Sequence, residues 1–167
     1  MRLKKGDRVA AYVPNKIETV ISFLACAKNG IIWSSCSPDF GVQGVVDRFK
    51  QIEPKVLITS DYYFYNGKKI NILDKVDEVI KQIPSIEKVI VYSYYKNEKE
   101  NLKNFIDFEE ALNIESDETF ERFEFNHPIY ILFSSGTTGK PKCITHGTGN
   151  VLIEHNKEFM LHCDIRD

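Results

Sequence analysis

A glycine-rich segment at residues 134–142 carries the side chains best suited to chemistry in this sequence. It reads SSGTTGKPK, and only Phe133 separates it from the apolar run at residues 129–132. Its glycines allow successive backbone N–H groups to converge on one anion, and its hydroxyl and ammonium groups add further donors. The segment therefore predicts a phosphate-binding loop, although a bare G-x-x-G is more often a plain soluble turn.

The spacing of the glycines excludes a Walker A loop. That loop has four residues between its glycines and a helix directly after it, whereas two residues separate Gly136 from Gly139. Pro141 and a strand-like run at residues 142–145 come next. The segment is thus expected to join two strands, which disfavours a phosphotransfer NTPase.

Composition limits the possible partners and compartments. The chain has 167 residues, 43% of them hydrophobic, and its net charge of -2 gives no overall attraction to nucleic acid or an anionic membrane. Its four cysteines are far apart and form no C-x-x-C pair, as expected for reduced thiols in the cytoplasm. No apolar run approaches the length of a membrane span, and no signal peptide is predicted. His155 and His162 lie too far apart along a helix to chelate one ion, so no protein metal ligand is expected.

The elements that must position the loop follow from the hydrophobic periodicity. Apolar runs alternate with stretches of helical spacing, which predicts an α/β fold with a largely parallel sheet and helices on both faces. Strands are expected at residues 8–13, 31–36, 55–59, 89–92 and 129–132. Helices are expected at residues 42–52, 73–83 and 108–112, with another near the C-terminus.

The first helix is expected between Asn15, as its N-cap, and Gly30, which stops it. Glu18 follows Asn15 by three residues, as in a capping box. One face of this helix carries Ile17, Val20, Ile21, Leu24 and Ala27. Residues 61–68 are expected to form a loop or a strand edge, and residues 94–104 a solvated loop.

The loop string resembles the phosphate-loop signature of the adenylate-forming superfamily, which includes acyl-CoA synthetases, luciferases and peptide synthetase adenylation domains. Other stretches, at residues 6–9, 30–58, 61–68 and 131–147, are similar to the acetoacetyl-CoA synthetase family. The run WSSCSPDFG at residues 33–41 discriminates within the superfamily, because acetyl- and propionyl-CoA synthetases usually carry a glycine-richer turn there.

The resemblance implies an acid–thiol ligase. In that family a carboxylate attacks the α-phosphate of Mg-ATP to give an acyl-adenylate and pyrophosphate, and the thiol of coenzyme A then displaces AMP. Acetoacetate is the implied acid, and the implied small-molecule partners are this carboxylate, ATP with Mg²⁺, and coenzyme A. A ligase similar to acetyl- or propionyl-CoA synthetase and a non-catalytic nucleotide-binding remnant remain as alternatives.

The resemblance also implies which residues form the sites. The ATP phosphates would be held by Ser134, Ser135, Gly136, Thr137, Thr138, Gly139 and Lys142. Thr138 would also lie near the Mg²⁺ ion. Coenzyme A would contact Ser37, Asp39, Phe40, Gly41, Tyr65 and Lys68, although relatives tend to carry arginines at the last two positions.

A final implication concerns domain organisation. Residues 1–167 are expected to be a fragment of the large N-terminal AMP-binding domain, without the C-terminal domain that carries the adenylation lysine. No catalytic residue is therefore assigned in this chain. Such a fragment is expected to be inactive alone and to self-associate through exposed sheet edges and apolar faces.

Overall fold

The computed structural model describes residues 2–94, 105–113, 119–134 and 139–165. Within these ranges the main sheet has seven strands in the order β7-β6-β3-β1-β2-β8-β9. Neighbouring strands are parallel except for β8 and β9, which are antiparallel. The strands are β1 (Arg8–Tyr12), β2 (Ile32–Cys36), β3 (Val56–Ser60), β6 (Lys88–Tyr92), β7 (Phe105–Asp107), β8 (Pro128–Ser134) and β9 (Lys142–Gly147).

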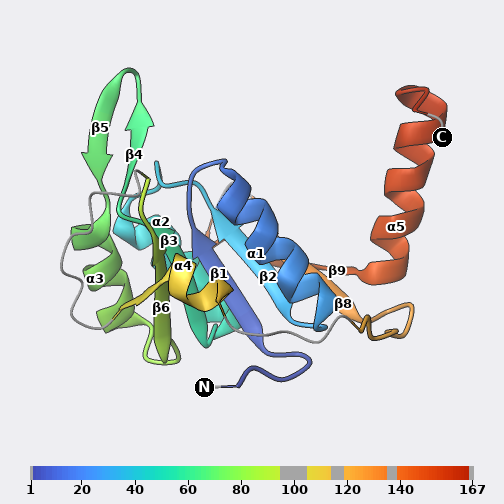
Figure 1. Cartoon of the computed structure of the whole chain (residues 1–167), viewed down its shortest axis with the longest axis horizontal. Coiled ribbons are helices and arrows are strands. Elements are labelled where there is room, and N and C mark those ends of the chain that lie inside the picture. The colour runs from blue at the N-terminus through green and yellow to red at the C-terminus, as the bar shows by residue number, and fades with distance from the viewer. Residues whose placement is uncertain (1, 95–104, 114–118, 135–138, 166–167) are drawn as a thin grey trace.

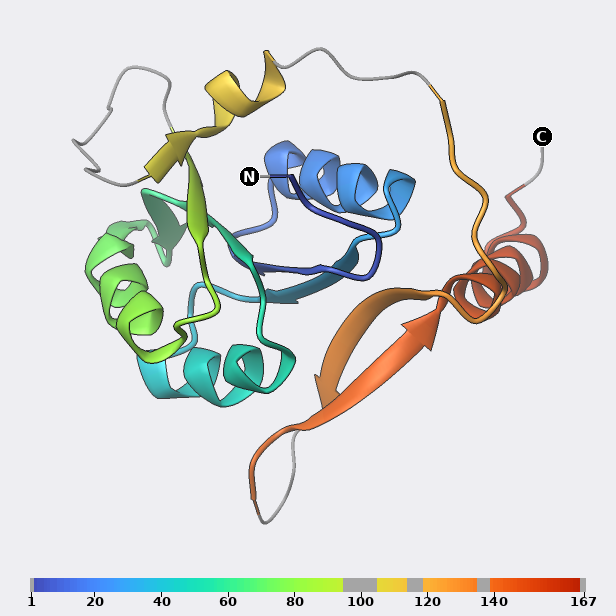
Figure 2. The same ribbon diagram turned by 90° about the horizontal axis from the view of Figure 1, so that it is seen from below.

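Helices cover both faces of this sheet, which confirms the predicted fold class. The helices are α1 (Ile17–Lys28), α2 (Val42–Ile52), α3 (Leu73–Gln82), α4 (Phe108–Leu112) and α5 (Thr148–Lys157), the last continuing as a π-helical turn, Glu158–His162. Helices α1 and α4 lie on one face, and α2 and α3 lie on the other (Figure 2). Helix α5 projects away from the sheet (Figure 1). None of the helices in the described ranges is both long and apolar enough to cross a membrane.

The alternation of side chains along β1 explains why its sequence is a continuous apolar run. Ala10 and Tyr12 pack into the core under α2 and α3, whereas Val9 and Ala11 pack into the core under α1 and α4. A parallel strand that is covered on both faces needs apolar residues at every position. This strand is the centre of the molecule.

Helix α1 departs from the sequence prediction in two respects. Its N-cap is Lys16 and not Asn15, and no side chain of the described residues caps it. Four residues of its apolar face are exposed, from 37% for Ile21 to 65% for Ile17, while Ser22 and Cys26 are buried. The predicted stop is confirmed, because Gly30 adopts a left-handed φ of 62° just after the helix.

Residues 62–71 form a second, two-stranded sheet where a loop or strand edge was predicted. Strand β4 (Tyr62–Tyr65) pairs with β5 (Lys68–Asn71) in an antiparallel hairpin. Both turn residues, Asn66 and Gly67, have positive φ values of 48° and 73°. Asn-Gly is the sequence that such a two-residue turn favours. The hairpin projects beyond the main sheet (Figure 1).

Candidate functional site

The glycine-rich loop joins two strands, as predicted, and the structure shows that these strands are antiparallel. Ser134 at the end of β8 pairs with Lys142 at the start of β9. Gly139 and Lys142 are exposed, as is Lys140. Ser135, Gly136, Thr137 and Thr138, which were predicted to bind phosphate, lie outside the described residues. Two accessible ammonium groups at the C-terminal half of the loop favour the approach of an anion.

The predicted coenzyme A loop follows β2 and is held by its own polar groups. The Ser37 hydroxyl donates to Asp39 Oδ2 at 3.1 Å. The Tyr12 hydroxyl lies 3.1 Å from the Pro38 carbonyl oxygen and also close to that of Phe40. Burial raises the pKa of Tyr12, so its hydroxyl keeps the proton that it donates to these carbonyls. The loop thus has a buried anchor from the central strand.

Phe40 in this loop is fixed by a contact that sequence reasoning missed. The Arg48 guanidinium lies 4.4 Å from the centre of the Phe40 ring, and Arg48 Nη1 donates to the Gly44 carbonyl at 2.7 Å. Gly41 is the N-cap of α2, so the helix that carries Arg48 starts directly at the loop. A cation over a ring face stabilises this arrangement.

Residues of the predicted coenzyme A loop and of the β4–β5 hairpin line one cavity of about 320 Å³. Ser37 and Asp39 line it from the loop, and Tyr63 and Phe64 line it from β4. Burial raises the pKa of Tyr63, and a hydrogen bond with Asp39 raises it further. Tyr63 is therefore a neutral donor facing a carboxylate, and it is a site residue that the sequence prediction did not include.

The two hairpin residues predicted to bind coenzyme A lie farther out. Tyr65 and Lys68 pair across the hairpin beside its turn, and both are exposed. The structure therefore places Ser37 and Asp39 on the cavity wall, with Phe40 and Gly41 next to it, and places Tyr65 and Lys68 at the hairpin tip.

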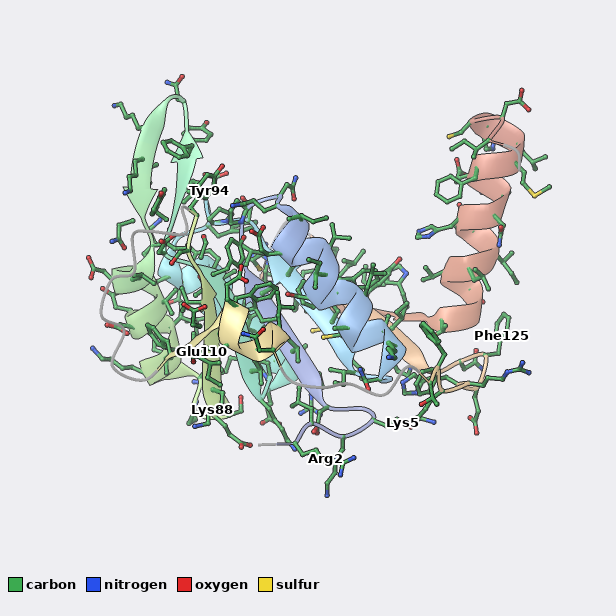
Figure 3. All side chains as sticks on the ribbon, viewed as in Figure 1. Arg2, Lys5, Lys88, Tyr94, Glu110 and Phe125 are labelled. Atoms are coloured by element: carbon green, nitrogen blue, oxygen red, sulfur yellow. The ribbon has the colours of Figure 1, made fainter. Side chains whose placement is uncertain are left out.

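A column of aromatic rings and lysines anchors the hairpin. The Tyr62 and Tyr94 rings stack with centroids 5.2 Å apart. Lys69 Nζ lies 3.8 Å from the Tyr62 ring centre, and Lys16 Nζ lies 4.1 Å from that of Tyr94. Tyr94 lies at the base of the hairpin, just beyond the end of β6 (Figure 3). A cation at each end of a stacked pair stabilises the hairpin against the sheet.

Asp61 adds a buried hydrogen-bond junction at the same place. Its Oδ1 accepts the backbone N–H of Tyr62 at 2.8 Å and that of Tyr94 at 2.9 Å. Asp61 is 3% exposed, and burial raises the pKa of its carboxyl. One side chain thereby connects β3, the hairpin and the end of β6.

The predicted coenzyme A loop and the described C-terminal part of the glycine-rich loop lie at opposite ends of α2. The Ser37–Gly41 loop leads into its first turn, whereas Gln51 near its last turn contacts the Pro141 carbonyl at 2.9 Å. At 1.5 Å per residue this helix is about 16 Å long. These two groups of predicted binding residues could therefore contact two separated parts of one long ligand, or two different ligands. Within the described ranges, no group of three or more His, Cys, Asp or Glu residues could hold a metal ion.

Known proteins resemble this chain along nearly its whole length. Residues 1–165 match the family model of the AMP-binding enzymes. The chain is 48% identical over 169 residues to acetoacetyl-coenzyme A synthetase of Rhizobium meliloti (strain 1021), covering 97% of this chain and 25% of the relative. It is 46% identical over 172 residues to acetoacetyl-CoA synthetase of Xenopus tropicalis, covering 97% of this chain and 26% of the relative.

A solved structure is also similar to this chain over nearly its whole length. Acetoacetyl-CoA synthetase from Streptomyces lividans superposes with a TM-score of 0.91 at 40% identity, over 98% of this chain and 25% of that chain. The chain therefore spans about a quarter of the length of these relatives.

Proposed function

This chain belongs to the AMP-binding enzyme family, and from that membership we propose that it forms part of an ATP-dependent acid–thiol ligase. The proposed reaction activates acetoacetate as its acyl-adenylate and transfers the acyl group to coenzyme A, releasing AMP and pyrophosphate. The observation that carries the proposal is 46–48% identity over 97% of the chain to proteins named as acetoacetyl-CoA synthetases. We also infer that residues 1–167 form part of the large N-terminal AMP-binding domain, which needs further parts of the enzyme for catalysis. A cytoplasmic location stays a prediction.

The choice of acid rests on overall similarity more than on contacts. In the discriminating run at residues 33–41, Trp33, Ser34 and Cys36 are buried in the sheet. Because these side chains are buried, their identity reflects how the sheet packs, and it supports family membership without identifying the acid. Residues that contact the acid are expected elsewhere in the enzyme. An acetyl- or propionyl-CoA synthetase-like ligase is the alternative, and a nucleotide-binding remnant without catalysis is the second.

In this proposal the glycine-rich loop neutralises charge on ATP. Attack on the α-phosphate drives negative charge toward the leaving pyrophosphate, so donors around the β- and γ-phosphates lower the barrier. Lys142 supplies an ammonium group, Ser134 a hydroxyl and Gly139 a backbone N–H, together with the predicted donors Ser135, Gly136, Thr137 and Thr138. Each charge-assisted contact is worth roughly 1.5–3 kcal/mol. Mg²⁺ would accompany ATP, and a hydroxyl oxygen such as that of Thr138 is a ligand this ion accepts.

The second proposed site takes the nucleotide end of coenzyme A. Ser37, Asp39, Phe40 and Gly41 would contact it from the loop, and Tyr65 and Lys68 from the hairpin tip. What supports this assignment is the cavity that the loop shares with β4, and the exposed cation of Lys68 at the tip of the same hairpin. The ring of Phe40, held by Arg48, offers a surface for a base.

Exchange of labelled pyrophosphate into ATP by the full-length enzyme tests the ligase proposal. We expect exchange to depend on acetoacetate and to fall about 10- to 100-fold in Lys142→Ala, because one donor to the transition-state charge is lost. Lys140→Ala removes the same charge two residues earlier and is expected to have the smaller effect. Exchange that is indifferent to the carboxylic acid supplied would rule out an acid–thiol ligase.

A further inference from the structure

Gln51, near the end of α2, contacts the residues on both sides of Lys142. Its Nε2 donates to the Pro141 carbonyl at 2.9 Å and to the Asp47 carbonyl at 2.6 Å. Its Oε1 accepts from the Cys143 thiol at a sulfur–oxygen distance of 3.6 Å. Both N–H bonds and the carbonyl of this one amide are therefore in use, and two of its three partners belong to the segment Pro141–Cys143, here called the loop exit.

The position of the loop exit in the fold gives this contact its importance. Lys142 is the first residue of β9, an edge strand of the main sheet, and it pairs with Ser134 of β8. Strand β8 is paired with β2 on its other side, where Tyr130 lies opposite Trp33. A contact between α2 and the distal end of the β8–β9 hairpin restricts the motion of this hairpin relative to the other strands of the sheet.

We propose that Gln51 is a positioning residue, which holds the loop exit on α2 and so fixes the backbone from which the Lys142 side chain extends. The inference rests on the proposed function, because it is there that Lys142 is assigned to the ATP phosphates. A lysine ammonium is a point charge on a flexible stem, so a fixed backbone limits the volume that it samples. Gln51 itself touches the loop and not the nucleotide.

Helix α2 provides its own control. Gln43 is an exposed glutamine on the same helix, and its Nε2 donates to Asp47 Oδ1 at 2.6 Å, within the helix. Gln51→Met and Gln43→Met each remove one amide from an exposed position and keep a similar side-chain length. Both variants are expected to fold, because neither residue is in a core.

Hydrogen exchange on this chain tests the contact without any ligand. We expect the backbone amides of residues 142–144 to exchange about 3- to 10-fold faster in Gln51→Met, the effect of losing one or two hydrogen bonds. Gln43→Met should leave these amides within about twofold of the wild type. Equal exchange rates in the wild type and Gln51→Met would overturn the proposal.

Two labelling measurements complete the test. In a Cys163→Ser background, Cys143 is expected to react about threefold faster with a disulfide reagent in Gln51→Met, because loss of the acceptor favours the thiolate. Millimolar Mg-pyrophosphate should protect Lys142 from amine acylation in the wild type and protect it at least about twofold less in Gln51→Met. Unchanged Cys143 reactivity, or equal protection in the two proteins, would overturn the positioning role. Absence of protection even in the wild type, with the exchange difference intact, would instead count against the proposed phosphate site.

Discussion

Asp61 is the residue whose ionisation bears most directly on the shape of the second proposed site. Its buried carboxyl accepts two backbone N–H groups at the base of the β4–β5 hairpin. Burial raises its pKa, so the folded state binds this proton more tightly than the unfolded state does. The stabilising contribution of this protonation is fully present below the ordinary Asp pKa of about 4 and is lost as the pH rises through the higher folded-state value.

We expect Asp61→Asn to change how stability depends on pH. The amide oxygen can still accept both N–H groups, but it carries no charge to desolvate. The free energy of unfolding of Asp61→Asn, relative to that of the wild type, should therefore increase between about pH 4 and pH 7. Asp61→Ala leaves two N–H groups without an acceptor and should cost about 2–3 kcal/mol. Urea unfolding at both pH values measures these differences, and a pH-independent difference between Asn and Asp would contradict the raised pKa.

Among the elements, the β4–β5 hairpin depends on the aromatic column more than on its own pairing. An isolated two-stranded hairpin is marginal in water. We expect Lys69→Met to lower the free energy of unfolding by about 0.5–1 kcal/mol and to speed amide exchange at residues 63–70, because it removes the cation over the Tyr62 ring.

Lys68→Met is the matched control for this prediction. Lys68 is the next residue on β5, so its side chain points to the opposite face of the hairpin. Its substitution should leave exchange in the hairpin within about twofold of the wild type. If both variants accelerate exchange equally, the acceleration results from the loss of a positive charge and not from the loss of the contact between Lys69 and the Tyr62 ring.

Sequence patterns predicted the elements that carry strong periodicity. The apolar runs at residues 8–13 and 55–59 form strands, and the spacing at residues 42–52 forms α2. The hairpin was missed because a run of aromatic and lysine residues lacks the alternation of a half-buried strand, although Asn66-Gly67 is a turn signal. Strand β7 was missed because three residues, Phe105–Asp107, are too few to show a period.

The candidate site was predictable only where local composition defines it. The glycine-rich loop and the Ser37–Gly41 turn are recognisable from consecutive residues. Gln51 and Pro141 are 90 positions apart, and only the fold brings them into contact. The exposure of the apolar face of α1 could not be predicted for a similar reason. Periodicity identifies an apolar face, but it does not show whether another part of the molecule covers that face.

Several large apolar side chains are exposed on two helices of the described part of the chain. Helix α1 leaves Val20 and Leu24 exposed, and α5 with its π-helical turn exposes Leu152, Ile153, Met160 and Leu161, the last at 74%. Contiguous apolar surface of this kind marks contacts with other protein. In a longer relative, further polypeptide would be available to cover it, because this chain spans about a quarter of such proteins.

We therefore expect the chain on its own to self-associate in solution. Sedimentation velocity should show a weight-average mass that rises with concentration above the 19.3 kDa of one chain. The double variant Leu24→Lys, Leu161→Lys places a charge on each apolar face and should shift the protein toward monomer, since burying an unpaired ammonium costs more than the contact gains. Lys50→Glu and Lys81→Glu alter charge on the polar surfaces of α2 and α3 and should leave the mass unchanged. A wild-type chain that stays monomeric at every concentration would contradict this prediction and mean that these faces do not bind each other.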